Sequence, residues 1–165
     1  MARVTLVGAQ QAPLLARPYF EGGDPGPIAA ALAQVPELIQ AGMGFIGAVY
    51  GPGSVPARQR EIVILRTSAR HGCRYCVAVH TRAAARAGLT AAEIDELQGA
   101  APGSDWSQPD RALVEFSDRM STDPARAVDA LGSHFQEHQV VELVTLAAAT
   151  IFLNRFATAL SLPLP

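Results

Sequence analysis

The segment EIVILRTSARHGCRYCVAVH, residues 61–80, decides the fold. Two apolar stretches flank Gly72, and each is patterned as a helix. A glycine in this position is typical of a helix that ends on a residue of left-handed backbone conformation. We therefore predict a helical hairpin with one helix over residues 56–71 and the next over residues 74–87, where Gly88 provides the second stop.

Two cysteines and a histidine begin the second helix of this hairpin, at steps of three and four residues: Cys73, Cys76 and His80. Such steps place side chains on one face of a helix. His80 can act as the base for the Cys76 thiol or stabilise its thiolate. Cys73 lies in the first turn, where unpaired amides and the helix dipole also favour a thiolate. Either sulfur could be activated, and the two can close a disulfide.

Glu61 is a carboxylate within an otherwise apolar stretch of the first helix. It precedes Gly72 by 11 residues, and His80 follows Gly72 by 8. At about 1.5 Å of rise per residue, the two side chains differ by about 4 to 5 Å along antiparallel helices. We expect a hydrogen bond between Glu61 and His80, either direct or through one water. Such a carboxylate orients the imidazole and raises its basicity.

The rest of the chain predicts one all-α domain, residues 1–165, of about seven helices. Residues 1–26 are rich in proline and glycine and should form an irregular arm. Prolines and capping residues mark further helix starts at Pro27, Pro36, Pro56, Thr90, Ser107 and Pro124.

The last helix is expected over residues 138–160 and should be heavily buried, because apolar residues recur there at helical steps. They are Val141, Val144, Thr145, Ala148, Phe152 and Phe156. Its apolar character extends round most of its circumference, which a small domain cannot easily cover. A homo-oligomer is therefore expected. Asn154 and Arg155 are interpreted as polar groups within that oligomer core.

Composition excludes several classes of partner. The net charge is −2, and the 13 basic residues, all arginine, are scattered, so we expect no nucleic acid. The longest apolar run, 143–153, has about 11 residues, whereas a membrane span needs about 20. The N-terminus does not resemble a signal peptide, which favours a cytoplasmic protein. In that reducing compartment, a lone cysteine pair is better interpreted as catalytic or metal-binding than as a structural disulfide.

Two plainer interpretations of the cysteines remain. The pair could simply be buried and structural. It could also form half of a zinc site with His80, although no motif supplies the remaining ligand. We predict no metal and no cofactor.

The sequence then resembles a known family. Glu61, eleven further residues, and CRYCVAVH at 73–80 are similar to the signature of the AhpD-like alkylhydroperoxidases within the carboxymuconolactone decarboxylase superfamily. The segment ELVTLAAATIFLNRF, residues 142–156, resembles the final core helix of that superfamily, so the likeness spans about residues 36–160. The resemblance implies a helical bundle assembled as a trimer or hexamer, without bound metal or organic cofactor.

The resemblance also implies a role for each site residue. Cys76 would attack the peroxide and pass through a sulfenic acid, and Cys73 would donate a proton and resolve that acid. His80 and Glu61 would form the proton relay. Tyr75 is a departure, because the best-characterised alkylhydroperoxidases carry a histidine at this position. Tyr75 could pack beside the thiols or donate a hydrogen bond.

The leading hypothesis is a thiol-dependent peroxidase or disulfide oxidoreductase of antioxidant defence. It would reduce hydroperoxides in a small apolar pocket and be restored by a dithiol donor, such as the lipoyl-bearing proteins that serve its better-known relatives. One alternative is a carboxymuconolactone decarboxylase-type lyase, which would use histidine and arginine and need no cysteines. The other is a non-enzymatic redox-sensing module.

Overall fold

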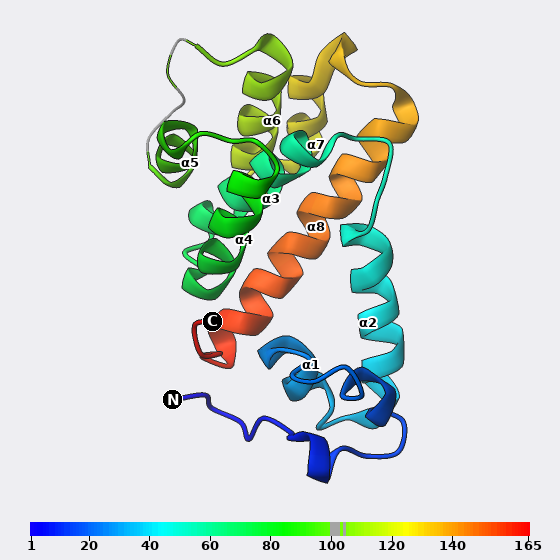
Figure 1. Ribbon diagram of the computed structural model, residues 1–165. Helices are drawn as coiled ribbons and strands as arrows, with labels where there is room; N and C mark the ends of the chain where they lie inside the picture. Colours follow the sequence, from blue (N-terminus) through cyan, green and yellow to red (C-terminus); the bar gives the residue numbers. More distant parts are fainter. Residues whose placement is uncertain (100–102, 104) are drawn as a thin grey trace.

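A computed structural model describes residues 1–99, 103 and 105–165. The described residues form α-helices and 3-10 helices without any strand (Figure 1), so the all-α prediction is confirmed. The described residues contain eight α-helices: α1 Pro27–Leu32, α2 Pro36–Tyr50, α3 Ala57–Arg70, α4 Arg74–Arg86, α5 Ala91–Gln98, α6 Gln108–Arg119, α7 Pro124–Ala127 and α8 Glu137–Ala159. Three 3-10 helices accompany them: η1 Ala9–Gln11, η2 Arg17–Tyr19 and η3 Val128–His134.

The predicted hairpin is formed by α3 and α4. Gly72 has a φ of 63°, which only glycine adopts without strain, and it lets the chain reverse directly after α3. The Cys73 amide then donates to the Ser68 carbonyl oxygen at 3.0 Å, which closes the end of α3. One detail differs from the prediction: Cys73 is the residue that caps α4 and has an extended backbone, so only Cys76 and His80 lie within the helix.

Helix α8 runs through the middle of the molecule, with α3 and α4 on one side and α2 on the other (Figure 1). Its predicted position is confirmed, but the stripe expected to be buried is largely not. Val141 is 66% exposed and Phe152 is 54% exposed, whereas Leu143 and Leu146 on a neighbouring face are fully buried. The reason is that α8 is apolar nearly all round, so periodicity alone does not select the face that packs.

By length and composition, α8 could cross a membrane, and it is the one such helix in the described part of the chain. In this fold its buried residues instead form the core with α3, α4 and α2.

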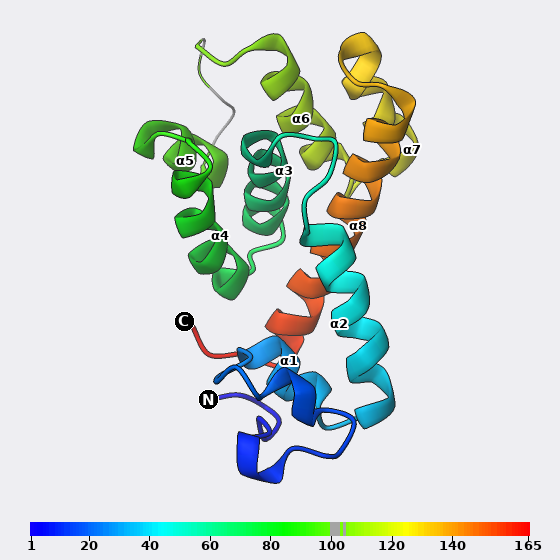
Figure 2. The same cartoon turned by 45° about the vertical axis from the view of Figure 1, so that its right-hand side comes forward.

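Three apolar clusters organise the packing. The largest joins α3–α6, η3 and α8, and the second joins the N-terminal arm to α1 and α2. The third lies between them and contains both cysteines together with Ala31, Ala157 and Leu162. Figure 2 shows α1 and the arm below the end of α8, on the side toward which α4 begins. The cysteines therefore lie where two halves of the chain meet.

The arm is mostly irregular, as predicted, and contains two short 3-10 turns. It is held in place by burial of Ala16 and Phe20 and by backbone contacts. The Arg3 amide donates to the carbonyl oxygen of Leu160 at 2.9 Å, which ties the arm to the tail that follows α8.

Candidate active site

The two cysteines form a disulfide at the N-terminus of α4, with their Cα atoms 5.3 Å apart. Cys73 Sγ accepts a hydrogen bond from the Cys76 backbone N–H at 3.3 Å. The same N–H would stabilise a Cys73 thiolate once the disulfide is reduced, because a helix N-terminus stabilises a negative charge. Both residues are nearly inaccessible, with 1% of Cys73 and 6% of Cys76 exposed.

The predicted contact between Glu61 and His80 is present. His80 Nδ1 lies 3.0 Å from Glu61 Oε2, across the hairpin from α4 to α3. Because a carboxylate accepts hydrogen bonds, this contact places the imidazole proton on Nδ1. The Nε2 atom of a neutral His80 is then an acceptor, and it can take a proton from a thiol.

A cavity of about 80 Å³ connects these groups, and its wall is mostly apolar. It is lined by Ile28, Tyr50, Ile64, Ser68, Tyr75, Cys76, Val79, His80, Thr150, Leu153 and Asn154. Helices α1, α2, α3, α4 and α8 all contribute, so the cavity exists only in the folded chain. Hereafter we call it the Cys76 cavity.

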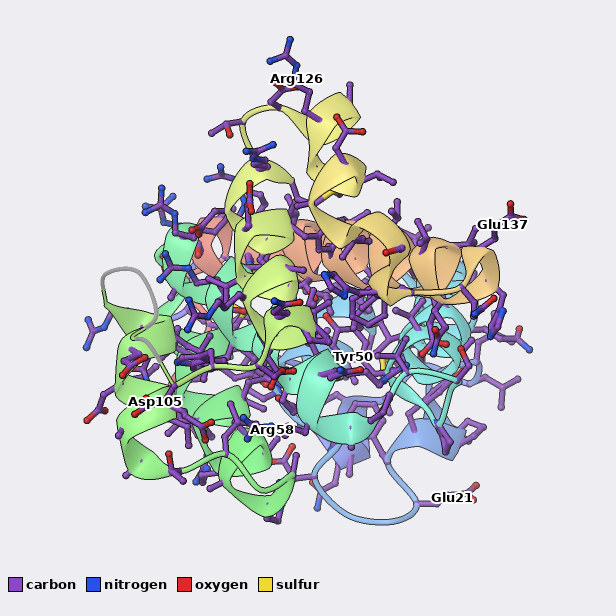
Figure 3. The ribbon with its side chains drawn as sticks, turned by 90° about the horizontal axis from the view of Figure 1, so that it is seen from above. Glu21, Tyr50, Arg58, Asp105, Arg126 and Glu137 are labelled. Carbon is purple, nitrogen blue, oxygen red and sulfur yellow. A yellow bond between two sulfur atoms is a disulfide. The ribbon has the colours of Figure 1, made fainter. Side chains whose placement is uncertain are left out.

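The hydroxyl groups of Tyr50 and Thr150 in the Cys76 cavity are already engaged. Thr150 Oγ1 donates to the Leu146 carbonyl oxygen at 2.8 Å, so its single proton is used. Tyr50 Oη lies 2.7 Å from Thr150 Oγ1 and must therefore be the donor in that pair. Burial raises the pKa of Tyr50 to about 12, which keeps the phenol protonated. Figure 3 shows Tyr50 in the midst of the helices, whereas Arg126 and Glu137 project outward.

Asn154 is the polar side chain whose position the sequence did not reveal. Its Oδ1 accepts a hydrogen bond from Ser68 Oγ at 3.1 Å, while its buried Nδ2 has no hydrogen-bond partner among the described residues. Sequence reasoning assigned Asn154 to an oligomer core, but the structure places it in the wall of the Cys76 cavity. The available signal was its step of four residues from Thr150, two polar groups on one face of an apolar helix.

Tyr75 is half-buried and packs in the same apolar cluster as the two cysteines. Burial raises the pKa of its phenol, and the nearby charge of Asp24 acts in the same direction. Tyr75 lines the Cys76 cavity and also a second cavity, which Cys73 lines. Of the two roles considered from the sequence, packing beside the sulfurs is the one observed.

The second cavity has a volume of about 300 Å³, and we call it the Cys73 cavity. It lies between the start of α4 and the tail after α8, two segments that approach each other in Figures 1 and 2. It is lined by Gly72, Cys73, Arg74, Tyr75, Ala157, Thr158, Ser161, Leu162 and Leu164. The two cysteines of one disulfide thus line different cavities.

No three histidine, cysteine, aspartate or glutamate side chains come together as a metal site within residues 1–99, 103 and 105–165. The five residues singled out from the sequence do come together: Cys73, Cys76, His80, Glu61 and Tyr75. The arrangement supplies two sulfurs, a base with its carboxylate, and one uncommitted amide.

Comparison with known proteins adds a family and a fold. Residues 36–106, which include the hairpin, match the carboxymuconolactone decarboxylase family. The chain is 27% identical over 112 residues to the uncharacterized protein YdfG of Bacillus subtilis, which covers 65% of this chain and 76% of YdfG.

Solved structures share the whole fold. An uncharacterized peroxidase-related protein of Ralstonia eutropha with an alkylhydroperoxidase AhpD core superposes with a TM-score of 0.85 at 19% identity, covering 99% of this chain and 92% of its own. The debrominase Bmp8 superposes with a TM-score of 0.81 at 22% identity, again covering 99% and 92%. At these identities, the likeness establishes the fold.

Proposed function

We propose that the chain is an AhpD-like member of the carboxymuconolactone decarboxylase superfamily and that it reduces hydroperoxides in antioxidant defence. The observation that carries the proposal is the Cys73–Cys76 disulfide, set one helical turn from a histidine that a carboxylate orients. A disulfide-forming pair of cysteines beside an oriented base is the set of groups that a thiol-dependent oxidoreductase uses.

The first step oxidises Cys76. His80 Nε2 takes the proton of the thiol, and the thiolate attacks the terminal oxygen of the hydroperoxide. A sulfur–oxygen bond forms as the oxygen–oxygen bond breaks, which leaves Cys76 as a sulfenic acid. The departing alkoxide takes the proton from the His80 imidazolium and leaves as an alcohol. Glu61, 3.0 Å from Nδ1, stabilises the imidazolium between the two proton transfers.

The second step closes the disulfide. The Cys73 thiolate, stabilised by the Cys76 N–H, attacks the sulfur of the sulfenic acid. A sulfur–sulfur bond forms as the sulfur–oxygen bond breaks, and the hydroxide takes one proton to leave as water. The Cα separation of 5.3 Å matches the ordinary span of a disulfide, so the step needs little backbone movement.

Asn154 is proposed to donate a hydrogen bond to the departing oxygen. Tyr50 and Thr150 have no free proton to offer, because they donate to Thr150 and Leu146 respectively. Asn154 Nδ2 is uncommitted, and Ser68 fixes the orientation of its amide. A pre-oriented donor in a mostly apolar cavity stabilises developing negative charge strongly.

Glu61 also lines a further cavity of about 450 Å³ beneath the loop between α2 and α3. Because Tyr50 and Ile64 line both this cavity and the Cys76 cavity, the carboxylate lies between the two spaces. Protons can therefore exchange between His80 and this further cavity through Glu61 without crossing the place where the peroxide binds.

The lyase alternative is less well supported. Such an enzyme would hold its acidic substrate with a cationic side chain, yet none of the described residues that line the Cys76 cavity is an arginine or lysine. Arg60 lies in the adjoining cavity and is paired with Glu142.

The proposed assembly is a homo-oligomer. Exposed apolar side chains lie on α2 and α8, including Phe45 (48% exposed), Val141 (66%) and Phe152 (54%). Large exposed apolar residues on adjacent helices are typical of a surface that another subunit covers. We expect Phe152→Asp to lower the molar mass measured by light scattering, whereas Glu137→Gln at the exposed start of α8 leaves it unchanged. An unaltered mass for Phe152→Asp would contradict the assembly.

The function is tested by identifying the cysteine that the peroxide oxidises. Reduced Cys73→Ser protein is treated with tert-butyl hydroperoxide and a sulfenic-acid reagent, and the product is mapped by mass spectrometry. We expect the adduct on Cys76, and none in Cys76→Ser. Absence of any sulfenate or disulfide at Cys76 in these experiments would contradict the proposed function.

Turnover separates an enzyme from a redox sensor. With excess dihydrolipoamide, a dithiol of the kind that serves better-known relatives, the wild-type protein should form many equivalents of tert-butyl alcohol. A sensor would stop after one equivalent.

A further inference from the structure

We propose that the dithiol reductant reaches the disulfide through the Cys73 cavity, while the hydroperoxide uses the Cys76 cavity, with Tyr75 as the wall between them. The inference rests on the proposed function, in which the pair is oxidised and reduced in turn. It adds a second binding site and assigns to Cys73 the sulfur that forms the mixed disulfide.

The two cavities divide the reactive groups between them. Cys76 and His80 line the smaller cavity and Cys73 lines the larger one, while Tyr75 is the residue that both share. An attacking thiolate must approach a sulfur along a path open to it. Cys73 is only 1% exposed, so a thiolate must enter a cavity to reach it, and Cys73 is the cysteine that lines the larger cavity.

The volumes suit different ligands. A water molecule occupies about 30 Å³ of liquid, so a cavity of about 80 Å³ holds a group of a few heavy atoms, such as the hydroperoxide end of a substrate. The Cys73 cavity, at about 300 Å³, has room for an aliphatic arm that ends in two thiols.

The lining of the Cys73 cavity also fits such an arm. Ala157, Leu162 and Leu164 provide an apolar wall for a hydrocarbon chain. Arg74, which is exposed, contributes a positive charge beside Cys73, and a neighbouring cation favours the thiolate form of an incoming thiol. A small molecule with an apolar stem and a thiolate tip is therefore the class of ligand expected.

Reduction of the Cys73–Cys76 disulfide by the dithiol takes two exchange steps. The dithiol's thiolate attacks Cys73 Sγ, a mixed disulfide forms, and the Cys73–Cys76 bond breaks. Cys76 leaves as a thiolate beside His80, from which it can take a proton. The second thiol of the reductant then attacks its own oxidised sulfur, which closes a cyclic disulfide and releases Cys73 as a thiolate at the helix N-terminus. The dithiol loses two electrons and two protons. The protein gains both electrons and, through His80, the proton on Cys76, while the second proton passes to solvent because Cys73 remains a thiolate.

Tryptophan substitutions test the route without disturbing the core. Thr158 is exposed and lines the Cys73 cavity, whereas its neighbour Ala159 is exposed but does not line it. Protein oxidised with diamide, which requires no peroxide chemistry, is mixed with dihydrolipoamide. Samples are quenched with iodoacetamide at timed intervals, and the alkylated cysteines of the protein are counted by mass spectrometry. We expect Thr158→Trp to slow this reduction at least about tenfold and Ala159→Trp to leave it unchanged.

The converse variant is Val79→Phe, which narrows the Cys76 cavity. It should slow disulfide formation by tert-butyl hydroperoxide and leave reduction by the dithiol unchanged, while Thr158→Trp leaves peroxide oxidation unchanged. Equal slowing of both half-reactions by either variant overturns the proposal of two routes. Failure of peroxide oxidation in the wild type contradicts only the proposed function, because the reduction is measured on diamide-oxidised protein.

The mixed disulfide identifies the attacked sulfur. Oxidised wild-type protein is treated with 6-mercaptohexanamide, which lacks a second thiol, and the freed cysteine is alkylated at once with iodoacetamide. Peptide mapping should find the hexanamide on Cys73 and the alkyl group on Cys76. The reverse assignment overturns the inference.

Discussion

The two ends of the disulfide lie in contrasting surroundings. On the Cys76 side, α3, α4 and α8 contribute residues from helix interiors, and hydrogen bonds fix nearly every polar group. On the Cys73 side, the wall comes from a turn, the first residues of α4 and the tail after α8. Cys76 is therefore placed for proton chemistry in a small space, and Cys73 lies beside a cavity with room for a larger reagent.

The means of stabilising negative charge differ in the same way. Cys73 Sγ has a backbone N–H and a helix N-terminus, which need no proton transfer. Cys76 has a titratable partner one turn away, and that partner has a carboxylate. A thiolate held by fixed dipoles suits a resolving group, whereas a nucleophile that must also protonate its leaving group benefits from an acid and base.

The largest effect that would sharpen this contrast is expected for His80→Asn. Loss of the base should lower the rate constant for oxidation by tert-butyl hydroperoxide by about 10³-fold. Reduction by a dithiol should fall far less, because a thiolate can leave without general acid assistance. Rapid quenching with alkylation measures both rates. His71→Asn is the control, since His71 lies one residue before the turn and pairs with Ser121 instead. A comparable loss in both half-reactions would break the contrast.

Asn154→Leu should have the next largest effect. The substitution keeps the branched shape of the side chain but removes the one uncommitted amide donor among the described residues that line the Cys76 cavity. Loss of a pre-oriented donor to developing negative charge costs about 10²-fold in rate. Reduction by the dithiol and the yield of disulfide should not change. In Ser68→Ala the donor remains but loses its orienting partner, so a smaller loss is expected. If Asn154→Leu oxidises at the wild-type rate, the amide has no part in the chemistry.

Much of the fold, and part of the site, follows from local signals in the sequence. Gly72 marks the turn, Thr90 forms the expected capping box with Glu93, and Ser107 caps α6 through the Asp110 amide. The Glu61–His80 contact could also be predicted, because a hairpin of two regular helices fixes the axial offset between them.

The remainder depends on tertiary packing that no local pattern encodes. Ser68 and Asn154 are 86 residues apart and meet only because α8 presents one particular face to α3. Since α8 is apolar nearly all round, its sequence does not say which face that is. The Cys73 cavity likewise requires the tail to fold back over the start of α4, and irregular segments carry no periodicity from which such a contact could be predicted.

Glu61→Gln is expected to have a moderate effect confined to the Cys76 side. Glutamine still accepts a hydrogen bond from His80 Nδ1 but does not bear the charge that stabilises the imidazolium, so oxidation should slow about tenfold. Dithiol reduction of diamide-oxidised protein should change little. Glu137→Gln, at the exposed first turn of α8, controls for loss of a negative charge. Stopped-flow rates with tert-butyl hydroperoxide decide the matter, and a wild-type rate for Glu61→Gln would mean that the carboxylate only positions the ring.

The smallest effect, and the one that most directly probes the Cys73 side, is expected for Leu162→Ala. Leu162 is 7% exposed, packs in the apolar cluster of the cysteines, and lines the Cys73 cavity. Its truncation should lower the free energy of unfolding by about 2 kcal/mol. This is the lower end of the range for leucine-to-alanine substitutions, because a tail at the surface can shift to fill the cavity that the substitution leaves. Widening the cavity should raise the rate of dithiol reduction about threefold and leave peroxide oxidation unchanged. Leu164→Ala, at a residue that is already 51% exposed, should do less of both. If Leu162→Ala slowed peroxide oxidation as well, the tail would hold the whole active site together, and the two sides of the disulfide would not be independent.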